Sequence, residues 1–172
     1  MPIYALGTQI PDIHPDAYVH PDAVIIGSVH IGAESSIWPT AVLRGDDGDI
    51  FVGERTSIQD GTIVHTTFHY PTTIGNDCTI GHNVHLEGCT IHDKALIGSG
   101  SVVLHQVVVG EEAVVGANAM VPNRKIIPPR AMALGVPVTI REDAIEPGWF
   151  DLGAESYVQR ARRYRSELRR LD

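Results

Sequence analysis

The chain has 172 residues, 43% of them hydrophobic and 20% charged, and its formal net charge is −8. This length fits one domain with its own core, and this composition excludes a disordered chain. The acidic balance argues against nucleic-acid binding, and no leader-like or membrane-spanning apolar run is evident. The two cysteines, Cys78 and Cys89, are too few for a disulfide framework. We therefore expect buried reduced thiols and a cytoplasmic protein.

Aliphatic residues recur with a period of six over most of the chain, often followed by glycine, as in IGHNVH and IGSGSV. This period fits neither a helix nor a hairpin meander. It is typical of a solenoid of parallel strands with three hexads per coil. The sequence therefore predicts an all-β parallel β-helix of about six to seven triangular coils over residues 1–137. The repeating positions are Ile13, Val19, Ile25, Ile31, Ile37, Leu43, Val52, Ile58, Val64, Ile74, Ile80, Leu86, Ile91, Ile97, Val103, Val109, Val115, Val121 and Ile127.

The repeat stops near residue 137, and a different pattern follows. Residues 138–153 are interpreted as a connector and residues 154–172 as a C-terminal helix of the same domain. Six arginines in this segment could bind a polyanion, but a solvated helix face on an acidic body is the favoured interpretation. The helix is predicted from an apolar stripe that should pack along the solenoid. The stripe comprises Tyr157, Ala161, Tyr164, Leu168 and Leu171.

Residues three hexads apart lie on one face of a solenoid, one rung, or about 4.8 Å, apart. Arg44, His65 and Glu87 are each second in their hexads and are predicted to form one column, the Glu87 column. Asp60 and His82 are each third and form the His82 column on an adjacent face. Two insertions in the repeat, at 46–51 and 66–73, lie in the coils beside these columns. The remaining histidines, His14, His20, His30, His92 and His105, are interpreted as ordinary surface residues.

This stacking predicts half of a metal site on each face. His65 and Glu87 can reach one metal ion from a single chain, because neighbouring rungs suit ligands that approach to about 2.0–2.2 Å. His82 lies around a corner and can complete that site only from a second chain. A threefold arrangement of triangular prisms would bring the faces together. We therefore expect a homotrimer with one divalent metal, most simply zinc, at each subunit interface.

The segments AVLRGDDGDI, SIQDGTIVH and IGHNVHLEGC resemble motifs of the gamma-class carbonic anhydrases, hexapeptide-repeat proteins with a left-handed β-helix. The resemblance covers about residues 10–137. It implies reversible hydration of carbon dioxide to bicarbonate, a lyase activity. It also implies roles for individual residues. Arg44 and Asp46 would form an intersubunit ion pair, and His65 and His82 from opposite subunits would be metal ligands. Gln59 would orient the reacting water with support from Asp60, and the C-terminal helix would offer Tyr157 to the pocket.

Position 87 departs from that family, which usually has a third histidine there. Glu87 can still bind zinc, because two histidines and a glutamate form an accepted catalytic set. Its negative charge would make a bound water less acidic and would shift the preference toward Mg²⁺ or Mn²⁺. His85 and His69 are interpreted as proton shuttles or as plain surface residues.

Two other functions remain open at this point. One is a non-catalytic trimeric binding or scaffold protein, which Glu87 makes plausible. The other is an acyltransferase, a common activity of hexapeptide-repeat proteins, which would bind acyl-coenzyme A between chains. The match to the RGD and IQDG segments and the two histidines in facing columns argue against it.

Overall fold

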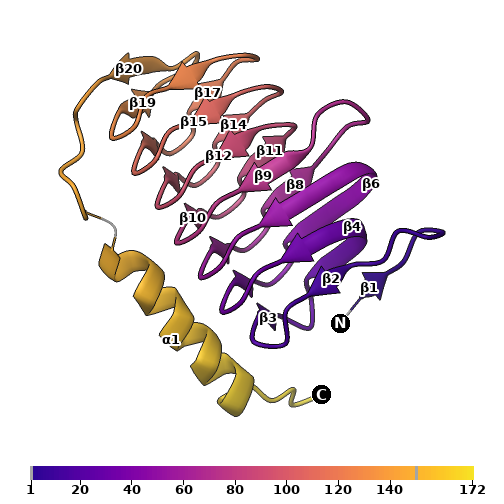
Figure 1. Ribbon diagram of the computed structural model, residues 1–172. Coiled ribbons are helices and arrows are strands. Elements are labelled where there is room, and N and C mark those ends of the chain that lie inside the picture. The colour runs from indigo at the N-terminus through magenta and orange to yellow at the C-terminus, as the bar shows by residue number, and fades with distance from the viewer. Residues whose placement is uncertain (1, 150) are drawn as a thin grey trace.

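The computed structural model describes residues 2–149 and 151–172, and it shows a parallel β-solenoid of about seven coils with one C-terminal helix (Figure 1). The fold class predicted from the hexad repeat is confirmed. One sheet forms a face of its own, and its strands are β3 (Tyr18–Val19), β5 (Ser36–Ile37), β7 (Ser57–Ile58), β10 (Thr79–Ile80), β13 (Leu96–Ile97), β16 (Val114–Val115), β19 (Met132–Leu134) and β20 (Thr139–Arg141).

A second sheet supplies the other two faces, because the long strands β4 and β6 continue from one face onto the next. The Glu87 face holds β1 (Ile3–Tyr4), the first half of β4 (Val24–Ile31), the first half of β6 (Val42–Val52), β8 (Ile63–His65), β11 (His85–Glu87), β14 (Val102–Val103) and β17 (Met120–Val121). The third face holds β2 (Asp12–Ile13), the second halves of β4 and β6, β9 (Thr72–Ile74), β12 (Thr90–Ile91), β15 (Val108–Val109) and β18 (Ile126–Ile127).

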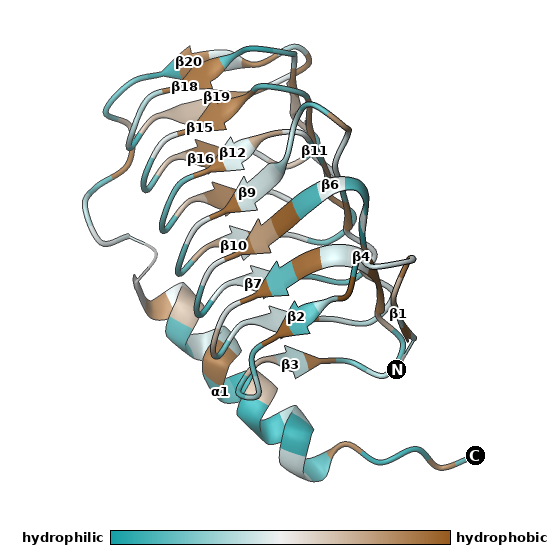
Figure 2. Ribbon diagram, turned by 45° about the vertical axis from the view of Figure 1, so that its right-hand side comes forward, coloured by the Kyte–Doolittle hydropathy of each residue, from teal (hydrophilic) through white to brown (hydrophobic). Residues whose placement is uncertain are grey.

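The core is the interior column of the repeating aliphatic residues. From Ile25 to Ile127 every repeating position is buried, whereas Ile13 and Val19 at the first coil are partly buried. Figure 2 shows hydrophobic residues on the strands and hydrophilic residues at many of the corners. A side chain next to a buried one along a strand points outward, so the second residue of each hexad faces solvent or a partner. This alternation places the Glu87 column on the outside of the wall.

The two insertions adopt different structures. Residues 46–51, the first insertion, do not form a loop. They continue β6 as an extended strand around the corner, with a register shift opposite Gly27–Val29. Residues 66–73 do project, and an antiparallel bridge between Thr67 and Tyr70 closes a small hairpin. Both segments lie beside the Glu87 column.

The C-terminal helix α1 (Asp151–Glu167) runs back along the coils, begins before the predicted residue 154 and ends well before residue 172 (Figure 1). Its predicted stripe is confirmed for Tyr157, Ala161 and Tyr164, which pack on Tyr18 and Trp38 of the solenoid. Leu168 and Leu171 lie beyond the helix and are exposed. No helix within the described ranges has the length and hydropathy of a membrane span.

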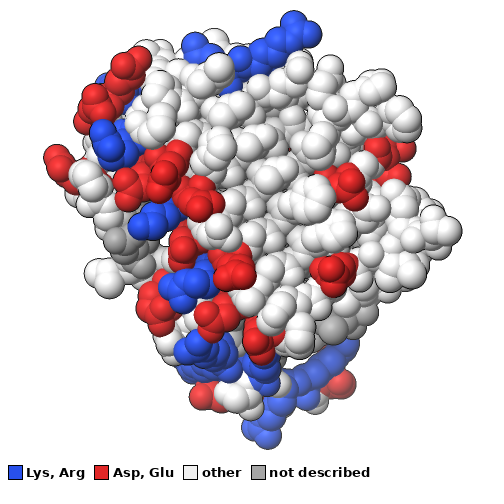
Figure 3. Space-filling view, viewed as in Figure 1, with Lys and Arg blue, Asp and Glu red and all other residues white. Residues whose placement is uncertain are grey.

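Charged groups also attach α1 to the solenoid. Arg55 binds Asp77 at 2.8 Å and Glu155 of α1 at 3.1 Å, and Arg162 of α1 pairs with Glu34. Figure 3 shows many charged side chains gathered along the edge where α1 lies, and few on the broad face of the coils beside it. Arg162 of the helix thus meets an acid of the solenoid, as the charge pattern predicted, whereas Glu155 of the helix meets a base of the solenoid.

Candidate functional site

The Glu87 column exists as predicted, because the strand register pairs Arg44 with His65 and His65 with Glu87. His65 Nδ1 lies 3.0 Å from Glu87 Oε1, and His65 Nε2 lies 3.2 Å from Asp46 Oδ1. Arg44 pairs with Asp46 within the same chain. Both nitrogens of His65 therefore face carboxylates, which hold the imidazole ring between Glu87 and Asp46.

Three histidines surround the Glu87 carboxylate. Besides His65, His85 Nε2 lies 3.2 Å from Oε2 and His105 Nε2 lies 3.7 Å from Oε1. His105 was interpreted from the sequence as an ordinary surface residue, and that interpretation is wrong. Gly88, with a φ of 61°, lets His105 approach, because a Cβ there would meet His105 and Tyr70.

Opposing effects set the acidity of the two carboxyls in this cluster. Partial burial tends to raise the pKa of Glu87, but hydrogen bonds from His65 and His85, with the charge of His105, lower the pKa below its ordinary value. Burial likewise acts to raise the pKa of Asp46, and hydrogen bonds from Arg44 and His65 lower it overall. Both groups are therefore carboxylates at neutral pH and can act as ligands or as hydrogen-bond acceptors.

The His82 column stands at the corner that follows β7 and β10. His82 Nδ1 lies 2.9 Å from Asp60 Oδ2, and both side chains are about half exposed. Because a carboxylate at one ring nitrogen fixes the tautomer, Nε2 of His82 is left free to bind a ligand.

A pocket of about 130 Å³ adjoins this pair, between the solenoid and α1. It is lined by Trp38, Pro39, Gln59, Asp60, His82, Tyr157, Arg160 and Tyr164. Gln59 is only 3% exposed, and within the described chain its Nε2 has no hydrogen-bond partner. A buried amide left unpaired costs about 1–3 kcal/mol, so this donor points to a group that the single chain does not supply.

The structure thus brings together His65, Glu87, Asp46 and His85 on one face, and His82, Asp60, Gln59 and Tyr157 at a neighbouring corner. It does not bring the two sets together in one chain. Across residues 2–149 and 151–172, no three His, Cys, Asp or Glu side chains are arranged to hold a metal ion. The completion of the site by a second chain stays a prediction.

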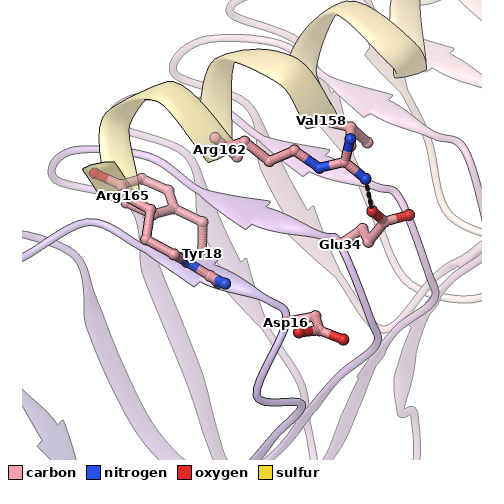
Figure 4. Close-up of a pocket in the computed structure, with 7 residues that line it drawn as sticks. Asp16, Tyr18, Glu34, Val158, Arg162 and Arg165 are labelled. Atoms are coloured by element: carbon pink, nitrogen blue, oxygen red, sulfur yellow. Dashed lines mark hydrogen bonds and ion pairs between the residues drawn. The ribbon is translucent and has the colours of Figure 1, made fainter. Parts of the chain in front are cut away.

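A larger pocket of about 270 Å³ lies under α1, next to the first coils (Figure 4). It is lined by Asp16, Tyr18, Glu34, Val158, Ala161, Arg162 and Arg165. Arg162 reaches across it to Glu34, and Arg165 donates to the carbonyl of Ala17. The predicted metal ligands and catalytic residues do not line this pocket, so we assign it to the docking of α1.

Comparison with known sequences identifies the family. Residues 71–105 and 88–123 match the model described as bacterial transferase hexapeptide (six repeats). The carnitine operon protein CaiE of Citrobacter koseri is 38% identical over 170 residues, which cover 98% of this chain and 86% of that protein. Gamma carbonic anhydrase 1, mitochondrial, of Arabidopsis thaliana is 45% identical over 107 residues, covering 59% of this chain and 39% of that protein.

The match to CaiE of Escherichia coli K12 is shorter. The two sequences are 46% identical over 112 residues, so the matched part covers 65% of this chain and 57% of that relative. Among solved structures, a hexapeptide transferase family protein from Anaplasma phagocytophilum has a TM-score of 0.89 and 34% identity, with 95% of this chain and 98% of that chain covered. A Bacillus cereus protein provisionally called an acetyltransferase has a TM-score of 0.92 and 35% identity over 95% and 96% of the two chains.

The fold and these relatives define a hexapeptide-repeat β-solenoid protein. Within that class, the chain belongs to the gamma-carbonic-anhydrase-like family.

Proposed function

We propose that this protein is a metal-dependent hydratase of carbon dioxide whose active site forms between two chains of a homotrimer. One observation carries the proposal: two incomplete clusters on adjacent faces, one ending in Glu87 and His65 and the other in His82 with the unpaired amide of Gln59. The first cluster lacks the third metal ligand that His82 would supply, and the second lacks the two ligands that His65 and Glu87 would supply.

The residues fit a divalent metal ion. His65 Nδ1 and Glu87 Oε1 are 3.0 Å apart, close enough to share one ion with bonds of about 2.0–2.2 Å. Asp46, fixed by Arg44, would then hold the other nitrogen of His65, in the way that carboxylates orient ligating histidines. His82 from a second chain would complete a set of two histidines and a glutamate. When bound, an ion such as Zn²⁺ supplies acidification of a water molecule at neutral pH.

The chain's own residues would position the reactants. Gln59 Nε2 would donate to an oxygen of the reacting water or of bicarbonate, which would satisfy its missing partner. Asp60 would keep Nε2 of His82 free for the ion. His85 Nε2, 3.2 Å from Glu87, would receive the proton released from the water. Tyr157 would close the pocket from α1.

The proposed trimer contact is the outer face that carries the Glu87 column. Ile63 is 46% exposed there, and the register places half-buried aliphatic side chains in one row with it. An exposed apolar row beside an incomplete polar site suits a symmetric contact with further copies of the chain. The row is Val24, Val42, Ile63, Val102 and Met120, with His85 between Ile63 and Val102.

A non-catalytic trimer is the second candidate. The observation that favours it is the engagement of Glu87 with His65, His85 and His105, because a carboxylate already held by three side chains can leave the site without a metal. The acyltransferase alternative is supported by the descriptions of the structural relatives, and it would place acyl-coenzyme A between chains.

The proposal is tested by metal content and carbon dioxide hydration of protein purified without chelator or metal-affinity tag. We expect about one ion per chain in the natural protein and nearly none in His65→Ala or His82→Ala. His92→Ala, an exposed histidine outside both clusters, is the matched control and should keep its metal. A natural trimer with no metal and no hydration would leave the non-catalytic role in its place.

A further inference from the structure

Arg160 is a free cation in the pocket that holds the unpaired amide of Gln59. It extends from α1, lines the pocket, and its guanidinium carbon lies 4.9 Å from the centre of the Tyr157 ring. In the described part of the chain it makes no ion pair or hydrogen bond. Its neighbours on α1 differ, because Arg162 pairs with Glu34 and Arg165 donates to Ala17.

The other groups of the pocket do not use these two donors. Asp60 is the acid of the lining, and His82 at 2.9 Å already engages it. Trp38 donates its Nε1 hydrogen to the hydroxyls of Ser36 and Ser57, and Tyr164 adds a further aromatic wall. A guanidinium without an ion pair and a buried amide without a partner among the described residues, both in the lining of a small and partly aromatic pocket, favour a ligand that accepts hydrogen bonds and carries negative charge.

We propose that this pocket binds a small planar oxyanion, a carboxylate or bicarbonate, through the guanidinium of Arg160 and the amide of Gln59. Its volume of about 130 Å³ equals roughly four water molecules, which admits acetate or bicarbonate but not a large substrate. The inference rests on the proposed function in one respect: bicarbonate is the product of that reaction. Arg160 then determines which anion remains near the metal.

Trp38 provides a readout that does not depend on catalysis. It is 4% exposed and lines the pocket. The chain has only one other tryptophan, Trp149, which is exposed and outside the pocket lining. In a Trp149→Phe background, Trp38 fluorescence is titrated with bicarbonate and with acetate, and with chloride at matched ionic strength as the reference.

We expect saturable changes with the oxyanions. Arg160→Gln should raise the Kd by about tenfold or more, and Arg160→Lys should raise it less, because lysine keeps the charge but loses the fork of donors. Arg163→Gln is the matched control. It removes the same charge from the same helix, where Arg163 pairs with Glu167, and should leave the Kd unchanged. Tighter binding of bicarbonate than of acetate would assign the site to the hydration product; the reverse order would assign it to an organic carboxylate.

Metal content and hydration of the same samples separate this inference from the proposed function. Anion binding that depends on Arg160 in a protein without metal or hydration would refute the hydratase and support the anion site. Active enzyme whose anion Kd and KM for bicarbonate are the same in Arg160→Gln and Arg163→Gln would refute the anion site alone. Absence of a saturable fluorescence change with either oxyanion would also overturn it.

Discussion

The Glu87 cluster and the His82 corner are built from the same repeat, yet they differ in how well a single chain satisfies them. At the Glu87 cluster each carboxylate oxygen meets a histidine, and Arg44 neutralises Asp46. At the His82 corner, a buried amide has no partner among the described residues, and the histidine is 54% exposed. The carboxylates of the first region have their partners within one chain, whereas the second region keeps a buried donor without one in the described chain. That contrast is expected when the second region is completed by a ligand or a neighbouring chain.

The largest effect is expected from converting Glu87 to the residue usual in the family. Glu87→His removes a negative charge from the proposed metal set, which should make the coordinated water more acidic and raise the hydration rate near neutral pH by about tenfold or more. Stopped-flow hydration with metal analysis on the same samples measures this. A variant that fills with zinc while the natural protein stays empty would instead show that Glu87 disables the site.

Stability should change differently in the two regions. Glu87→Gln leaves histidine partners poorly satisfied and should lower the free energy of unfolding by about 1–2 kcal/mol. Gln59→Leu removes an unpaired buried amide and should be neutral or stabilising by about 1 kcal/mol, at the expense of activity. Denaturant unfolding of metal-free protein compares the two. Equal destabilisation by both substitutions would contradict the difference described above.

A smaller effect concerns acidification. Because the folded-state pKa of Glu87 lies below its ordinary value of 4.5, its contribution to stability is fully present above that pH and is lost as pH falls through the lowered pKa. The difference in unfolding free energy between the natural protein and Glu87→Gln should therefore shrink as the pH falls below 4.5 and through the lowered pKa. Unfolding curves across this range would show the trend, and a difference that grows on acidification would be inconsistent with it.

The hexad repeat predicted the parts of the site that depend on register. Arg44, His65 and Glu87 had to stack because their hexads lie one coil apart, and Asp60 and His82 followed the same rule. It also predicted the interior aliphatic positions, since a period of six specifies which residue points inward.

Other features depended on backbone detail that the repeat does not encode. His105 occupies a different hexad position from Glu87, and the glycine corner at Gly88 brings it to the carboxylate. The three extra residues before Val52 could have formed a loop, but they extend β6 instead. The pocket lined by Gln59 and Arg160 lies where α1 docks, a tertiary contact that an apolar stripe predicts only in outline.

The most direct test of a site shared between chains is complementation between two inactive variants. His65→Ala and His82→Ala are each expected to bind no metal, whereas trimers assembled from an equal mixture of both should regain metal at about a quarter of their interfaces, because random assembly pairs an intact His65 with an intact His82 at that frequency. Metal content of the mixed trimers, compared with each variant alone, measures this. Recovery near a quarter supports a site between subunits; no recovery above the separate variants would contradict it.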